Sequence, residues 1–340
     1  MKEIGISSMI LKTGLDIAKV CIGASVCGLG ALYLGQRQLI YPRPNQIYDP
    51  KDAGAELLRI KQDESSVVSA AWFPPRDEDI EIFIYFHGNG DQIGAAGSFL
   101  ATEFKRRYGF GFLAVEYPGY GLAQGQPSEK SIIHTANIAL QHCIHELKIE
   151  PHRIILFGQS LGTGPALQLA CSYHDIIPKL ILLSPFTSIP AVAHSVFPFI
   201  PLSFLRVAIH DTFDNLKFMR SLSAIKRHDK KHPKCLILHG TEDEIVPFTQ
   251  GQQLAAAGLA PLSSLTSSIS PSSNQSRRNN GAISDFSFST TFIPLRDLGH
   301  NNVFFDFYAH PNDSSPTSVI DIIARFASSS SSSSSSSIAN

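Results

Sequence analysis

A serine held between two glycines, in the pattern GQSLG at residues 158–162, constrains this chain more than any other feature. The residues just before it, 154–157, are the continuous apolar run IILF, which is typical of a strand buried on both faces of a sheet. The residues after it, 162–173, have the length and periodicity of a helix. A turn this tight between a strand and a helix needs small residues on both sides of the serine. It also strains the serine backbone and pushes the hydroxyl clear of the sheet. The pattern therefore predicts a nucleophile at Ser160.

Strands and helices alternate along most of the chain, which is typical of a mostly parallel sheet with helices on both faces. The 340 residues, 43% of them hydrophobic and 17% charged, are enough to bury a large core. We expect one α/β domain over residues 39–327 with appendages at both ends. Strands are expected at 67–73, 80–86, 112–117, 153–157, 179–183, 235–239 and 290–295. Helices are expected at 92–108, 129–147, 162–173 and 248–257.

Composition and residue spacing argue against several classes of partner. The formal net charge of −1 leaves no excess of positive charge to bind phosphate backbones, so nucleic acid is not expected as a partner. The five cysteines match neither a zinc ligand set nor a small disulfide framework, and no histidine pair has metal-ligand spacing beside an acid. We therefore expect no metal and no cofactor. A monomer is the expected oligomeric state. Acylation of Cys21 or Cys27 is an alternative to their simple packing.

The first 38 residues are expected to attach the protein to a membrane. Residues 20–36 (VCIGASVCGLGALYLGQ) carry no charged side chain and are bounded by Lys19 and Arg37. Their number is near the lower limit for a membrane-spanning helix. The favoured interpretation is an uncleaved single-pass anchor, and the alternatives are a cleaved signal peptide or a helix that is buried or lies on a surface. The flanking Lys and Arg residues are about equal in number, which leaves the orientation open.

Two polar stretches interrupt or follow the alternating pattern. Residues 261–289 are rich in serine and asparagine, and residues 328–340 contain a long serine run. Neither stretch can bury enough apolar surface to offset the entropy of ordering it. We expect the first to be a disordered insertion and the second a disordered tail.

A serine hydroxyl needs a base and an orienting acid before it becomes a strong nucleophile. On a strand–turn–helix scaffold of this kind, the acid and then the histidine follow the serine in the chain. Asp243 lies in an acidic turn after the apolar strand 235–239, and we favour it over Glu242 and Glu244 because its short side chain sits in mid-turn. His300 follows the last expected strand, directly after a glycine. The predicted triad is therefore Ser160, Asp243 and His300.

Acyl transfer also requires donors for the negative oxygen that develops on the carbonyl. The HGNG loop at residues 87–90 follows the apolar strand 82–86, so the backbone amide of Asn89 is the expected first donor. The amide of Leu161, at the start of a helix, is the expected second donor. A plain Gly/Asn turn is the alternative interpretation of the loop.

Over residues 39–310 the chain resembles the membrane-anchored α/β-hydrolase-domain proteins of the Bem-type and depalmitoylase-like branch. The resemblance implies the α/β-hydrolase fold, with Ser160, Asp243 and His300 as triad and Asn89 and Leu161 as oxyanion donors. Members of that family act on long-chain acyl thioesters of proteins or on lipid esters, so an acylated protein or a lipid is the implied substrate. The matching stretches are LIYP (39–42), HGNG (87–90), EYPGYG (116–121), PSE (127–129), GQSLGTG (158–164), SPFTS (184–188), HG (239–240) with Asp243 and VP (246–247), and GH (299–300).

Residues 186–213 lie where this fold often inserts a lid. The segment is rich in apolar side chains and is interrupted by Pro198 and Pro201. We interpret it as the wall of an apolar acyl groove, with Phe186, Phe197 and Phe199 as candidate substrate contacts; core packing of an ordinary short cap is the alternative. Two further alternatives for the whole chain are a catalytically idle membrane interaction module and a serine peptidase.

Overall fold

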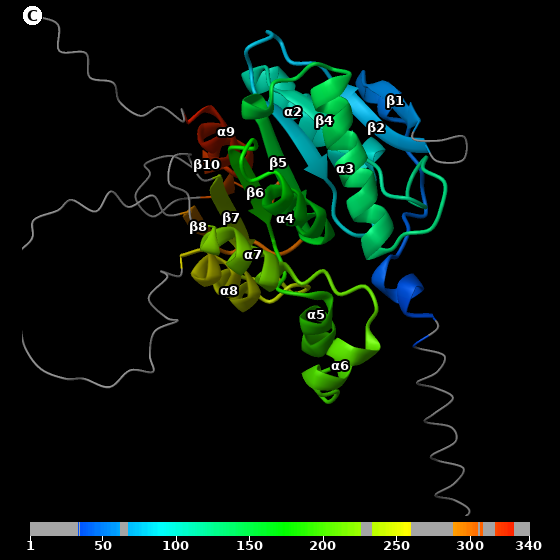
Figure 1. The fold of residues 1–340 in the computed structure, drawn as a ribbon, viewed down its shortest axis with the longest axis vertical. Coiled ribbons are helices and arrows are strands. Elements are labelled where there is room, and N and C mark those ends of the chain that lie inside the picture. The colour runs from blue at the N-terminus through cyan, green and yellow to red at the C-terminus, as the bar shows by residue number, and fades with distance from the viewer. Residues whose placement is uncertain are drawn as a thin grey trace, which may run out of the picture.

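The computed structural model describes residues 33, 35–61, 67–225, 233–259, 288–304, 307–308 and 317–329. Its centre is an eight-stranded sheet in the order β1-β2-β4-β3-β5-β6-β7-β8 (Figure 1). β1 pairs antiparallel with β2, β2 pairs antiparallel with β4, and all other neighbours in the sheet are parallel. The expected mostly parallel sheet is confirmed.

The observed strands agree closely with the expected ones. The bounds are β1 (Glu56–Lys61), β2 (Val67–Phe73), β3 (Ile82–Phe86), β4 (Gly111–Val115), β5 (Ile154–Gln159), β6 (Lys179–Leu183), β7 (Lys234–Gly240) and β8 (Ser289–Leu295). A short antiparallel pair, β9 (Phe307–Tyr308) and β10 (Thr317–Ser318), lies outside the main sheet. β1 was not expected, because this edge strand has exposed polar side chains and lacks the continuous apolar run of the inner strands.

Helices cover both faces of the sheet. α3 (Glu129–His145), α4 (Thr163–Ser172), α7 (Asn215–Ala224) and α8 (Phe248–Leu259) pack on one face, and α2 (Ser98–Tyr108) and α9 (Val319–Ser328) pack on the other. Neither α7 nor α9 was expected from the sequence. α9 begins at a capping box formed by Ser318 and Asp321 and buries an apolar face, so the folded domain extends slightly past residue 327.

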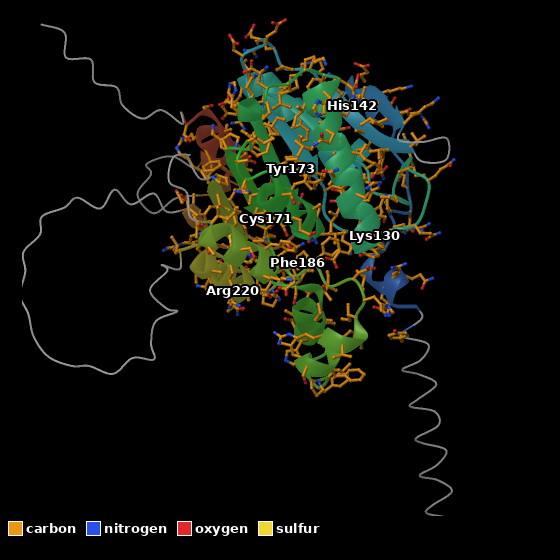
Figure 2. The ribbon with its side chains drawn as sticks, in the orientation of Figure 1. Lys130, His142, Cys171, Tyr173, Phe186 and Arg220 are labelled. Carbon is orange, nitrogen blue, oxygen red and sulfur yellow. The ribbon has the colours of Figure 1, made fainter. Side chains whose placement is uncertain are left out.

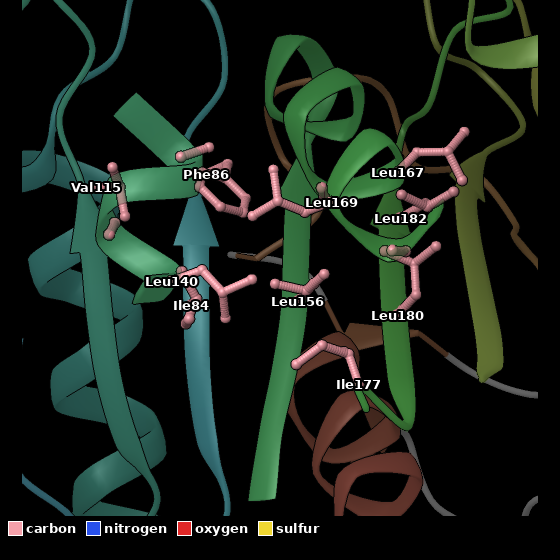
Figure 3. Packing of buried hydrophobic residues seen from close by; sticks show 14 of the residues in the cluster. Ile84, Phe86, Val115, Leu140, Leu156, Leu167, Leu169, Ile177, Leu180 and Leu182 are labelled. Atoms are coloured by element: carbon pink, nitrogen blue, oxygen red, sulfur yellow. The ribbon is translucent and has the colours of Figure 1, made fainter. Parts of the chain in front are cut away.

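Alternate side chains of each strand enter the two cores, as the period-two geometry of a strand requires. In β3, Ile82, Ile84 and Phe86 belong to the core beneath α3 and α4, whereas Phe83 and Tyr85 belong to the core beneath α2 and α9. Figure 3 shows the first core, where Ile84, Leu156 and Leu180 of neighbouring strands meet leucines of the covering helices. Burial on both faces explains why these strands are continuously apolar.

The lid, residues 186–213, contains two short helices, α5 (Ile189–Val196) and α6 (Leu202–Ala208), that project from the rest of the domain (Figure 1). Its entry and exit are joined by backbone hydrogen bonds from Ile189 to the Thr212 carbonyl (2.8 Å) and from Leu216 to the Thr187 carbonyl (3.1 Å). The Glu129 carboxylate, at the start of α3, accepts the backbone amides of Thr212 (2.7 Å) and Phe213 (2.9 Å). Both ends of the lid are therefore fixed to the domain.

The predicted anchor, insertion and tail lie almost entirely outside the described residues. Residues 35–40 are helical and lead into the domain beside the lid. Among the residues that are described, no helix has the length and apolar character needed to cross a bilayer.

Gly164 is required by the packing of the lid exit. A Cβ atom at this position would lie 2.3 Å from the Phe213 ring. We predict that Gly164→Ala lowers the free energy of unfolding by about 1–3 kcal/mol, because a clash of this kind forces the neighbours to move. Urea denaturation measures the change. A Gly164→Ala/Phe213→Leu double variant should cost less than the sum of the two single changes; strictly additive costs would show that the two residues do not meet.

Candidate active site

Ser160 lies in a tight turn between β5 and α4, and its backbone is left-handed, with φ of +48°. Such a φ is uncommon outside glycine and marks a strained position. A Cβ atom on Gly158 would lie 2.3 Å from the Gly162 carbonyl oxygen, and one on Gly162 would lie 2.0 Å from the Phe86 carbonyl oxygen. The two glycines therefore let the turn close on itself and approach the end of β3. The Thr163 hydroxyl donates to the Ser160 carbonyl (2.6 Å) and supports the same turn.

Three side chains from distant parts of the chain form a continuous hydrogen-bonded line. His300 Nε2 lies 3.0 Å from Ser160 Oγ, and His300 Nδ1 lies 2.8 Å from Asp243 Oδ2. All three residues are less than one-tenth exposed. With Nδ1 protonated and donating to the carboxylate, the imidazole presents an unprotonated Nε2 to the serine hydroxyl. This is the geometry of a nucleophile, a base and an orienting acid.

The Asp243 carboxylate is held ionised by several donors. Its Oδ1 accepts the backbone amides of Ile245 (3.0 Å) and Val246 (2.7 Å). Its Oδ2 also lies 3.3 Å from Nε2 of the buried His239. Burial alone would raise the pKa of Asp243, but the hydrogen bonds from His239 and His300 outweigh it and hold the pKa well below its usual range.

His239 and Glu244 support the site in ways that the sequence analysis did not foresee. His239 was interpreted as a packing or turn residue; its Nε2 also lies 2.9 Å from the Val246 carbonyl, which ties both ends of the acid turn together. A Cβ atom on Gly251 would lie 2.3 Å from the His239 ring, so α8 must carry a glycine there. Glu244 was expected to face solvent, whereas its carboxylate accepts a hydrogen bond from the His300 backbone amide at 3.4 Å. The four-residue spacing between His239 and Asp243 was the feature of the sequence that could have indicated the supporting role of His239.

The HGNG loop lies against the serine turn. A Cβ atom on Gly88 would lie 3.7 Å from Ser160 Cβ, which places this loop beside the nucleophile. The Asn89 side chain is fixed from two sides: its amide donates to the Ile40 carbonyl (2.5 Å), and its oxygen accepts from the Tyr120 hydroxyl (2.6 Å). Leu161 follows the nucleophile directly and precedes α4. Both expected oxyanion donors therefore belong to backbone segments that border Ser160.

The EYPGYG stretch at residues 116–121 holds the HGNG loop from beneath. The Glu116 carboxylate lies 3.0 Å from His87 Nε2, and both side chains are fully buried. Burial alone would lower the pKa of His87, but the adjacent Glu116 raises it above its ordinary value. The Tyr117 hydroxyl donates to the His87 carbonyl (2.8 Å), and the two rings pack with centroids 4.1 Å apart. A Cβ atom on Gly121 would lie 2.1 Å from the Glu116 carboxylate, so only glycine fits at that position.

Of the three phenylalanines expected to contact substrate, Phe197 and Phe199 lie together, with ring centroids 6.2 Å apart, and Phe186 is not part of that pair. Phe186 is buried at the lid entry (labelled in Figure 2), where its ring meets Phe213 with centroids 6.5 Å apart. Phe197 and Phe199 lie between α5 and α6, and Phe199 is 80% exposed. Their contact with a substrate remains a prediction. Within the described ranges, no cluster of three or more histidine, cysteine or acidic side chains is arranged to hold a metal ion.

Comparison with known proteins places this architecture among hydrolases. Residues 77–230 match the family described as "Serine aminopeptidase, S33". Two solved structures share the fold at 17% identity: an esterase of Pyrococcus furiosus, Pf2001 (TM-score 0.51, 76% of this chain and 88% of that one), and Est1E of Butyrivibrio proteoclasticus with ferulic acid bound (TM-score 0.50, 79% and 96%).

Three related sequences are informative. Alpha/beta hydrolase domain-containing protein 17C of Homo sapiens is 32% identical over 168 residues, 49% of this chain and 45% of that protein. Protein 17B of Xenopus laevis is 33% identical over 174 residues, 50% and 53% of the two chains. Protein bem46 of Schizosaccharomyces pombe is 27% identical over 241 residues, 67% and 77%. The match to the first group spans about half the length of those relatives.

The sheet order defines the α/β-hydrolase fold, and the serine turn with its hydrogen-bonded histidine and aspartate has the arrangement of a serine hydrolase active site. Within that class, the chain is similar to the alpha/beta hydrolase domain-containing 17 proteins and to Bem46.

Because the pKa of Asp243 is lowered in the folded protein, the free energy of unfolding should depend on this carboxyl group at acid pH. A carboxylate whose pKa is lowered by folding stabilises the protein above its unfolded pKa, near 3.8, and this stabilisation is lost as the pH falls below that value. The difference in free energy of unfolding between the wild type and Asp243→Asn should therefore shrink as the pH is lowered from about 5 to about 2. Urea denaturation across this range measures it. Asp77→Asn, in an exposed turn, is the control; a difference independent of pH at position 243 would contradict the prediction.

Proposed function

We propose that this protein hydrolyses acyl esters or thioesters through a covalent acyl-enzyme on Ser160. The observation that carries the proposal is the line of hydrogen bonds from Ser160 Oγ to His300 and from His300 to Asp243, at 3.0 and 2.8 Å. A serine in a strained turn, a base in contact with it and an ionised acid behind the base are the parts that this chemistry needs.

In the first half of the reaction, His300 Nε2 removes the proton from Ser160 Oγ as the oxygen attacks the acyl carbon. The negative charge that develops on the carbonyl oxygen is stabilised by the backbone amides of Asn89 and Leu161. By precedent, losing one such donor slows catalysis about 10²–10³-fold. The imidazolium then returns its proton to the departing alcohol or thiol, and the acyl group stays on the serine.

In the second half, a water molecule takes the place of the leaving group. His300 removes a proton from the water, the resulting nucleophile attacks the acyl carbon, and Ser160 recovers its proton as the carboxylic acid leaves. Asp243 stays ionised throughout, because its low pKa keeps the proton on the imidazole. It orients the ring and stabilises the imidazolium in both halves.

The proposed substrates are long-chain acyl thioesters of proteins or lipid esters. Three points support this choice: the resemblance to the depalmitoylase-like branch, the apolar lid, and the uncharged stretch at residues 20–36, which would hold the domain at a membrane where acyl chains are abundant. We propose single-pass anchoring by this N-terminal region. Peptide hydrolysis is the second candidate, because the family match over residues 77–230 carries the description of a serine aminopeptidase.

A fluorophosphonate probe should label Ser160. We expect the wild-type protein to be labelled and Ser160→Ala to be inert, and labelling is read by in-gel fluorescence and peptide mapping. Ser184→Ala is a matched control, since Ser184 also follows a strand, is buried and has a positive φ of 47°; it should retain labelling. A Ser160→Ala protein that still labels would refute the proposed nucleophile, and an unlabelled wild type would favour an idle interaction module.

Substrate profiling should separate the remaining alternatives. We expect kcat/KM to rise with acyl chain length for thioesters and oxygen esters, and to remain negligible for aminoacyl amides. Asp243→Asn should lower kcat by about 10⁴-fold, as loss of the orienting acid does in other serine hydrolases. Efficient release of amino acids from peptides, without cleavage of acyl esters, would replace this proposal with the peptidase alternative.

A further inference from the structure

The projecting part of the lid exposes an unusual concentration of apolar surface. Five of the large hydrophobic side chains that are exposed in the described part of the chain fall within residues 196–207. Val207 is 85% exposed and Phe199 is 80% exposed. The set is Val196, Phe197, Phe199, Phe204 and Val207. Grouped apolar side chains on a projecting element mark a contact surface rather than ordinary surface variation.

A groove beside this apolar tip is cationic. The groove has a volume of about 790 Å³ and lies between the lid and helices α7 and α8. Arg206 of the lid and Lys217 and Arg220 of α7 line it (Arg220 is labelled in Figure 2). Asp214 also lines it, and its carboxylate caps α7 by accepting the Lys217 backbone amide at 3.1 Å. Within the part of the chain that the structure describes, none of the three cations has a carboxylate within ion-pair distance.

The groove is separate from the hydrolytic site. None of the triad residues lines it, and neither do Asn89 or Leu161. The protein as a whole has a formal net charge of −1, so three cations around one cavity, each without an ion-pair partner among the described residues, are a local feature rather than a property of the entire surface. Their arrangement is complementary to an anionic group such as a phosphate.

The N-terminal segment contacts the same end of the molecule. The Gln36 side chain donates to the Ala208 carbonyl (3.3 Å) and accepts the His210 backbone amide (2.8 Å). Arg37 pairs with the buried Asp211 at 3.0 Å. In Figure 1 the first described residues lie at the same end as α5 and α6. The contacts of Gln36 and Arg37 with residues at and directly after the end of α6 therefore place the described start of the chain against the exit of the lid.

We propose that the lid tip and the cationic groove together form a face that binds an anionic phospholipid bilayer. The apolar side chains of residues 196–207 enter the boundary between headgroups and acyl chains, and Arg206, Lys217 and Arg220 bind lipid phosphates and carboxylates. Apolar residues flanked by cations are the combination that interfacial membrane binding uses. Phe197 and Phe199 then meet acyl chains within the bilayer, including those of a membrane-bound substrate.

This face sets how the domain is oriented on the membrane. A single anchor would leave the domain free to rotate about its attachment, whereas a second contact through the lid limits that rotation. Binding by this face does not depend on the triad, so Ser160→Ala should bind lipid as the wild type does. A failure of the lipid experiment therefore leaves the proposed hydrolytic function intact, and the reverse also holds.

The test uses the full chain and vesicles of phosphatidylcholine with or without phosphatidylserine. Arg206→Gln/Lys217→Gln/Arg220→Gln should lose affinity for the anionic vesicles by roughly 100-fold, at about fivefold per cation, with little change on neutral vesicles. Lys51→Gln/Arg59→Gln/Lys61→Gln is the matched control, because it removes the same charge from exposed positions in β1 and in the turn of helix just before it. Phe204→Ser/Val207→Ser should weaken binding to both kinds of vesicle.

Hydrogen exchange on the vesicle-bound full chain distinguishes binding through the lid from attachment through the N-terminal anchor alone, because the anchor alone would not protect the lid. Peptides covering α5 and α6 should become protected on anionic vesicles, and this protection should be reduced in the triple glutamine variant. Unchanged exchange in α5 and α6 on vesicle binding would overturn the proposal, as would equal affinities for the triple variant and its control. Activity of the triple variant on a soluble short-chain ester should remain at the wild-type level, which separates lost binding from misfolding.

Discussion

The structure depends on how closely the turn after β5 approaches the end of β3. Gly162 lies so near the Phe86 carbonyl that no side chain fits between them. Gly158 approaches the Gly162 carbonyl in the same way. This contact forces Ser160 into a left-handed backbone and brings the HGNG loop beside it. The apolar strands beneath supply the rigidity that maintains the strain. The proposed nucleophile and the loop with the proposed oxyanion donor are thus positioned by the same close packing of backbone.

Two buried contacts between histidine and carboxylate serve different purposes around this turn. The His300–Asp243 contact joins two loops and leaves Nε2 of His300 facing the Ser160 hydroxyl, in position for proton exchange. The His87–Glu116 contact is fully buried beneath the HGNG loop, and further hydrogen bonds from Tyr117 and Tyr120 fix that loop. The first contact orients a group that reacts, and the second fixes a scaffold. Removing one partner from the second would leave an uncompensated polar group in the core.

Much of the fold was predictable because its strands are buried on both faces. The runs before Ser160 and before Asp243 have unbroken apolar character, and residues that follow such strands must meet at one edge of a parallel sheet. β1 was missed because half of it faces solvent, and α9 was missed although its Ser318–Asp321 capping box was a usable signal. The supporting role of His239 depends on contacts with Val246 and Gly251 that arise only in the folded chain. The sequence displays the four-residue spacing from His239 to Asp243, but not these two contacts.

The attachment of the lid has a consequence for how this enzyme scaffold can diversify. Glu129 holds the exit of the lid through two backbone amides, and Gln250 holds the entry through the amide and hydroxyl of Thr187. Because these bonds mostly recognise backbone, they place few demands on the side chains between them. Residues 189–210 therefore form a segment with two fixed ends, which could be exchanged for one of different length or polarity while the residues around Ser160 keep their positions. Asp211, whose side chain pairs with Arg37, would stay in place.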